Sequence, residues 1–115
     1  MIISHKHKFI YIKCRKTAGT SVEISLSKIC GKDDIITPLT KEDEKVRLDL
    51  GFRGAQNYHK PKGEWSRKER WQYFRKGKQP KKFYHHIASQ EIVNLIPNEI
   101  WDSYFKFTVE RNPFD

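Results

Sequence analysis

The chain has 115 residues and a net charge of +9, with 23 Lys and Arg against 14 Asp and Glu. That length suits one domain, and aromatic residues, at 13% of the chain, argue against disorder. No apolar run reaches the roughly 18–20 residues of a membrane span, the N-terminus lacks the apolar core of a signal peptide, and two cysteines exclude a disulfide framework. These features predict a reduced, cytoplasmic protein without a membrane span.

In chain order, the first predicted element is a strand at residues 9–12, a short run of apolar and β-branched side chains. A polar turn follows over residues 14–19. Thr20 or Ser21 is then expected to cap a helix that ends before a glycine. The apolar stripe of this helix runs through Val22, Ile24, Leu26 and Ile29 to Gly31.

Residues 35–36 form a brief apolar stretch. A charged helix is predicted from Thr40 to Leu50, with a capping box between Thr40 and Asp43. Residues 51–82 are predicted to be loop-like, with a short helix at 67–75. The remaining patterns predict a helix at 89–96 closed by Pro97 and a strand at 104–109. Strands and helices in this order are typical of α/β proteins. We therefore expect residues 1–115 to form one domain with an α/β fold and a parallel sheet. We expect it to be truncated, because such a sheet needs more than two strands.

The whole net charge lies in residues 53–82, which hold eleven Lys and Arg against Glu64 and Glu69. Aromatic residues lie within this segment or directly after it: Tyr58, Trp65, Trp71, Tyr73, Phe74, Phe83 and Tyr84. Interleaved basic and aromatic side chains can bind a polyanion through phosphate or sulfate contacts and ring stacking. They can equally form a solvated insertion whose rings pack onto the neighbouring core. Both interpretations stay open from the sequence.

The most informative stretch is residues 16–21, Lys-Thr-Ala-Gly-Thr-Ser, between a strand and a helix. The helix N-terminus presents unpaired N–H groups there, and the glycine lets the backbone approach an anion closely. Thr17, Thr20 and Ser21 add hydroxyl donors, and Lys16 adds a positive charge. The pattern predicts a phosphate or sulfate site, with an ordinary capped helix as the alternative. It is not a Walker A loop, because Lys16 precedes the glycine instead of following it.

This loop resembles the 5′-phosphosulfate loop of the sulfotransferases that use 3′-phosphoadenosine 5′-phosphosulfate (PAPS). Most members have proline where this chain has Arg15, a change that lowers the rigidity of the turn but keeps the lysine and hydroxyls. Residues 109–115, Val-Glu-Arg-Asn-Pro-Phe-Asp, are similar to the segment that begins the family's 3′-phosphate site. The resemblance runs from about Phe9 to Asp115 and is closest to the branch that acts on carbohydrates. It implies that residues 1–115 are the N-terminal part of a single domain with a P-loop-like three-layer fold.

The resemblance implies transfer of a sulfuryl group from PAPS to a hydroxyl of a carbohydrate or similar acceptor, without a metal. The cofactor-binding residues that it implies are Arg15, Lys16, Thr17, Ala18, Gly19, Thr20, Ser21 and Arg111. Arg111 offers a planar fork for the 3′-phosphate, and its alternative role is a salt bridge with Glu110. Ligands of open α/β sheets bind beyond the carboxyl ends of the strands, where both segments would meet.

Transfer to a hydroxyl also needs a base. His86 is the first candidate and His85 the second, because a neutral histidine suits proton removal and both precede the predicted helix at 89–96. Related carbohydrate sulfotransferases use a histidine in this region or a glutamate. Lys16 would stabilise charge on the bridging oxygen. The family's 3′-phosphate segment continues beyond the Arg-Asn-Pro motif, so we expect the 115 residues to be a fragment that is inactive alone.

Two other classes of protein compete with this interpretation. A P-loop nucleotide kinase shares the strand, loop and helix, but it predicts a Gly-Lys-Ser/Thr order and an acidic residue for magnesium, for which Glu110 is a weak substitute. A non-enzymatic polyanion-binding module would depend on residues 53–82 and would bind without Lys16 or Arg111. The sequence leaves the acceptor and the oligomeric state open.

Overall fold

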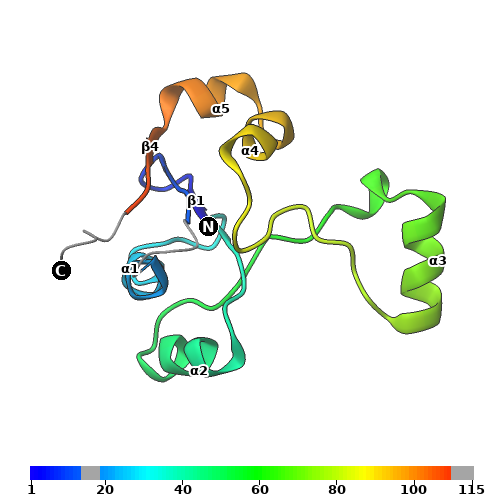
Figure 1. Ribbon diagram of the computed structural model, residues 1–115, viewed down its shortest axis with the longest axis horizontal. Coiled ribbons are helices and arrows are strands. Elements are labelled where there is room, and N and C mark those ends of the chain that lie inside the picture. The colour runs from blue at the N-terminus through cyan, green and yellow to red at the C-terminus, as the bar shows by residue number, and fades with distance from the viewer. Residues whose placement is uncertain (14–18, 110–115) are drawn as a thin grey trace, which may run out of the picture.

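The computed structural model describes residues 1–13 and 19–109. Its elements are β1 (Ile2–Ser4), β2 (Phe9–Tyr11), α1 (Gly19–Ser27), β3 (Ile35–Ile36), α2 (Lys41–Asp49), the 3₁₀ turn η1 (Lys62–Glu64), α3 (Arg67–Lys76), α4 (Ser89–Leu95), α5 (Asn98–Ser103) and β4 (Phe105–Phe107) (Figure 1). Among these residues, no helix is long and apolar enough to cross a membrane.

The predicted capping residues locate the start of α2 correctly and that of α1 incorrectly. Thr40 caps α2 by accepting a hydrogen bond from the Asp43 N–H, as predicted. The helix α1 instead begins at Gly19, ahead of its predicted caps, and it ends at Ser27. Ile29 therefore lies outside the helix and is 42% exposed, so its predicted place in the apolar stripe is wrong. The helix α5 and the strand β1 were not predicted.

The sheet has the strand order β3-β1-β2-β4. β2 and β4 are parallel, with Phe9 opposite Phe105 and Tyr11 opposite Phe107. β1 runs antiparallel to both β2 and β3. The predicted parallel sheet is therefore confirmed only for β2 and β4, whereas β1 makes the sheet mixed; the fold is α/β. The physical reason is the connection between β1 and β2, a turn of four residues. Such a turn is too short for the crossover that two neighbouring parallel strands need, so β1 and β2 are antiparallel.

The turn between β1 and β2 is organised by the buried carboxylate of Asp34. It accepts hydrogen bonds from the N–H groups of His5 (2.8 Å) and Lys6 (3.2 Å) and from the Ser4 hydroxyl (2.7 Å). The Gly31 N–H donates a further one at 2.8 Å. Burial alone would raise the pKa of Asp34, but these hydrogen bonds hold it below its ordinary value. Asp34 thus ties the turn to the segment that precedes β3.

Helices cover both faces of the sheet. Because side chains alternate along a strand, Ile3 and Ile10 face one core cluster and Ile2 and Tyr11 face another. The first cluster includes Ile92 of α4, together with Phe83 and Ile87. Against the second pack Val22 and Leu26 of α1, with Cys30, Phe9 and Ile36. In Figure 1, α1 lies on one side of the strands and α4 and α5 lie on the other.

Residues 57–83, here called the arm, project from the body and carry η1 and α3 at their tip (Figure 1). The two segments of the arm are hydrogen-bonded to each other, from Lys60 N to Pro80 O at 2.8 Å and from Lys82 N to Tyr58 O at 2.9 Å. Tyr58 packs against the core at the base of the arm, beside the buried Phe83. No residue of α3 is buried, so its aromatic rings do not pack onto the core.

Candidate functional site

The two motif segments leave the sheet from neighbouring strands at the same edge. β2 and β4 are parallel, and the pairing continues past β2, where Ile12 N donates to Phe107 O at 3.0 Å. Residues 14–18 follow β2 and residues 110–115 follow β4, and both lie outside the described residues. The carboxyl ends of neighbouring parallel strands are the usual ligand position in an α/β sheet.

The helix α1 begins at this edge, with Gly19 as its first residue. Its N-terminal N–H groups and dipole favour an anion. Thr20 in its first turn accepts a hydrogen bond from Lys13 Nζ at 2.8 Å, and Ser21 is exposed. Of the predicted phosphate-site residues, Gly19, Thr20 and Ser21 are described and lie at the start of α1, while Arg15, Lys16, Thr17, Ala18 and Arg111 lie outside the described residues.

Lys13 is a buried cation that joins three parts of this edge. It lies just beyond β2, and its exposed fraction is 6%. Besides its bond to Thr20, the ammonium contacts His85 Nε2 and lies 3.4 Å from Glu23 Oε2. The strand, the first turn of α1 and the segment before α4 are thereby held together by one charged group.

Glu23 supplies the negative charge that this buried cation needs. Its carboxylate is fully buried, and Oε1 accepts a hydrogen bond from the Met1 ammonium at 2.7 Å. The Thr37 hydroxyl lies 3.2 Å from the same oxygen. Burial lowers the pKa of the Met1 amino group, and the nearby Glu23 carboxylate opposes that shift. A buried group stays charged only where such partners offset its loss of hydration.

The two histidines differ in their surroundings. Burial, reinforced by the neighbouring Lys13 ammonium, lowers the pKa of His85 to about 4. His85 is therefore neutral at pH 7, and its Nε2 accepts from Lys13, which leaves the ring proton on Nδ1. The His86 ring lies 4.3 Å from the His85 ring, centroid to centroid. His86 Nδ1 is buried and has no hydrogen-bond partner within residues 1–13 and 19–109.

A cavity of about 430 Å³ adjoins both histidines. It is lined by Pro38, Leu39, Thr40, Lys81, Tyr84, His85 and His86. His85 thus connects two features: its ring lines the cavity, and its Nε2 contacts the lysine at the sheet edge. The cavity therefore lies next to the end of the sheet from which both motif segments depart.

Lys13 and Glu23 were missed by the reasoning from sequence, although both flank the recognised loop. Lys13 directly follows an apolar strand and Glu23 lies near the start of a helix, and neither position carries a local signal for burial. Only the tertiary contacts reveal them as a buried pair.

No group of three or more His, Cys, Asp or Glu side chains that could hold a metal ion gathers in the described part of the chain.

The stability of the protein is expected to fall as the pH drops from about 6.5 to about 4, because of His85. In this window the unfolded state binds a proton that the folded state excludes, so protonation favours unfolding. Above pH 6.5 the His85 contribution is constant. Chemical denaturation of the wild type and of His85→Gln across this pH range isolates the effect of His85. The difference between their unfolding free energies should change with pH only if the pKa of His85 is shifted in the folded state.

Comparison with known proteins found no matching family model, no matching curated protein and no matching solved structure.

Proposed function

We propose that the protein is a PAPS-dependent sulfotransferase that transfers a sulfuryl group to a hydroxyl of a carbohydrate or similar acceptor. The observation that carries the proposal is the parallel pairing of β2 and β4, after which the Lys-Thr-Ala-Gly-Thr-Ser loop and the Arg-Asn-Pro segment both begin at one edge of the sheet. A nucleotide with phosphates at both its 5′ and 3′ positions needs two such anion-binding segments side by side.

In the proposed reaction, the acceptor oxygen forms a new S–O bond while the bond from sulfur to the 5′-phosphate oxygen breaks. The leaving group is adenosine 3′,5′-bisphosphate. Lys16 and the N-terminus of α1 stabilise the charge that develops on its departing oxygen, and Arg111 holds its 3′-phosphate. The proton of the acceptor hydroxyl passes to a histidine. As in phosphoryl transfer, alignment and electrostatics supply most of the catalysis.

His86 is the better candidate for the base. The Nε2 atom of His85 already accepts a hydrogen bond from Lys13, which occupies the lone pair that would take the proton. His86 lines the cavity, and its Nδ1 has no partner in the described part of the protein. We assign His85 a positioning role, in which it holds Lys13 and its ring contacts that of His86 at an interplanar angle of 41°.

The test of the proposal is a thermal-shift comparison of adenosine 3′,5′-bisphosphate with ATP and magnesium. A ligand that binds only the folded state raises the melting temperature. We expect stabilisation by the bisphosphate and none by ATP with magnesium. Stabilisation by ATP with magnesium alone would instead indicate a nucleotide kinase, and stabilisation by neither would remove the nucleotide site.

Replacing Lys16 with alanine is expected to weaken binding of the bisphosphate by about one to two orders of magnitude, because one charge-assisted contact to phosphate contributes roughly 1.5–3 kcal/mol. Calorimetric titration measures the change. Lys45→Ala, on the exposed surface of α2, is the matched control and should bind as the wild type does. Equal affinity of the wild type and Lys16→Ala would exclude the loop from the site.

A further inference from the structure

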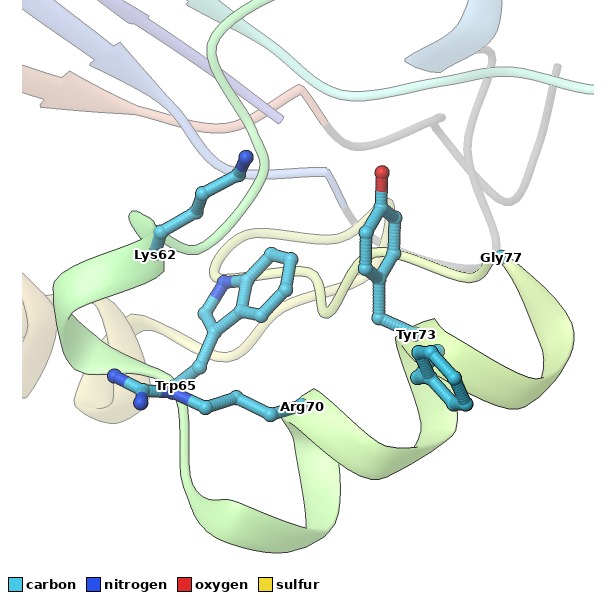
Figure 2. Close-up of a pocket in the computed structure, with 6 residues that line it drawn as sticks. Lys62, Trp65, Arg70, Tyr73 and Gly77 are labelled. Carbon is cyan, nitrogen blue, oxygen red and sulfur yellow. The ribbon is translucent and has the colours of Figure 1, made fainter.

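The tip of the arm contains a hollow of about 700 Å³ lined by Lys62, Trp65, Arg70, Tyr73, Phe74 and Gly77. Figure 2 shows the Lys62 and Arg70 side chains extending on either side of the Trp65 ring, with Tyr73 next to it. The Trp65 and Tyr73 rings meet edge to face, with centroids 5.1 Å apart. The hollow therefore combines aromatic walls with two cationic side chains.

A second aromatic surface adjoins the hollow on α3. Trp71 and Phe74 stack with centroids 6.2 Å apart, and their exposed fractions are 59% and 83%. Arg67 and Arg70 lie beside these two rings. Clustered aromatic side chains that a small protein leaves in water commonly mark a binding surface.

The charges on α3 are not neutralised within the described residues. The helix carries five cations: Arg67, Lys68, Arg70, Arg75 and Lys76. Its one carboxylate, Glu69, accepts from Lys60 Nζ at 3.0 Å and from Ser66 N at 2.9 Å, so it is already engaged in the arm. None of the five cations forms an ion pair with a described carboxylate. The surface is therefore complementary to an anion and would repel a basic partner.

The base of the arm leads to the cavity beside the histidines. The returning segment of the arm supplies Lys81 to that cavity, and Tyr84, which directly follows the arm, lines it next to His86. An extended ligand that lies along the arm can therefore contact the cations at the tip and also reach the cavity at the base. A small molecule would occupy either the hollow at the tip or the cavity at the base, but not both.

We propose that the arm binds an anionic polysaccharide. One acidic sugar stacks against the aromatic walls of the hollow, its carboxylate or sulfate contacts Lys62 and Arg70, and adjoining acidic units meet the other cations of α3. This inference rests on the proposed function, since the same polymer then presents its hydroxyl at the cavity beside His86. It narrows the acceptor from carbohydrates in general to acidic ones.

The test is a calorimetric titration, without nucleotide, of the full chain with oligogalacturonate, an oligosaccharide of uronic acids. The matched probe is the fully methyl-esterified oligomer, which has the same sugars and no charge. We expect the acidic oligomer to bind, the binding to weaken as salt is added, and the esterified oligomer not to bind. Equal binding of the two oligomers, or no binding of either, would overturn the proposal.

Two charge-reversed proteins locate the binding. Arg70→Glu with Arg75→Glu should raise the Kd for the acidic oligomer by about tenfold or more, as two charge-assisted contacts are lost. Lys28→Glu with Lys45→Glu makes the same change of net charge at exposed positions outside the arm and should leave the Kd unchanged. Because α3 buries no residue, the arm variant should fold, which circular dichroism checks. An unchanged Kd in a folded arm variant would contradict the proposal.

Nucleotide binding separates this inference from the proposed function. The arm variant should bind adenosine 3′,5′-bisphosphate as the wild type does, and Lys16→Ala should keep its affinity for the acidic oligomer. If the bisphosphate fails to bind while the oligomer binds through α3, the enzyme assignment fails and the docking site stands. A single-stranded oligothymidylate of equal charge that binds more tightly than the oligosaccharide would overturn the polysaccharide assignment in favour of a nucleic acid.

Discussion

Replacing Glu23 with glutamine is expected to lower the unfolding free energy by about 3–5 kcal/mol, the usual effect of removing one member of a buried ion pair. The carboxylate is fully buried and lies 2.7 Å from the Met1 ammonium and 3.4 Å from the Lys13 ammonium. Without it, two positive charges remain in the interior with no carboxylate of the described residues paired to them. For a small domain of about 5–15 kcal/mol total stability, this is a large fraction. Urea denaturation measures it.

Glu42→Gln, on the exposed first turn of α2, is the matched control and should change the stability by about 0.5 kcal/mol or less. The double variant Glu23→Gln with Lys13→Met should recover part of the loss, because it removes one of the unpaired charges as well as the carboxylate. A loss below about 1 kcal/mol for Glu23→Gln would show that the pair contributes little to the fold.

Replacing His86 with alanine should lower sulfuryl transfer by about 10²–10⁴-fold, the usual contribution of a positioned general base. Its affinity for adenosine 3′,5′-bisphosphate should stay the same, because the residue acts on the acceptor and not on the nucleotide. The measurement is transfer of labelled sulfuryl groups from PAPS, in a form of the protein that shows turnover.

His85→Ala is the informative comparison, since the two rings are neighbours with different partners. It should retain part of the activity, with a smaller loss that reflects the release of Lys13. If His85→Ala loses activity and His86→Ala keeps it, the base is His85. If both variants remain active, neither histidine is the base, and a glutamate takes its place.

The local signals in the sequence predicted α2, α3 and α4 close to their observed bounds, but they missed α5 and predicted the sheet poorly. A capping residue acts over one helical turn, so Thr40 and Asp43 were enough to locate the start of α2. The strand β1 has only three residues, and its partner β3 lies more than 30 residues along the chain. No local sequence pattern indicates the pairing of β1 with β3. Because β1 was not predicted, the sheet was expected to be parallel when it is mixed.

The candidate site shows the same division. The loop at residues 16–21 is recognisable because its donors are consecutive in the chain. The buried network joins Lys13, Glu23, Thr37 and His85, which come from four separate segments. Sequence spacing alone carries no sign of their contact. The choice between His85 and His86 as the base likewise depends on which of the two rings Lys13 contacts, and this is a property of the folded chain.

The most direct measurement is an NMR titration of the isotope-labelled protein with adenosine 3′,5′-bisphosphate. The amide signals of Ile12 and Lys13 after β2, of Gly19 and Thr20 in α1, and of Val109 after β4 should shift together and follow one dissociation constant. That result would mean that both motif segments bind one nucleotide at one edge of the sheet. Shifts confined to the arm at residues 57–83, or to only one of the two segments, would contradict a PAPS site.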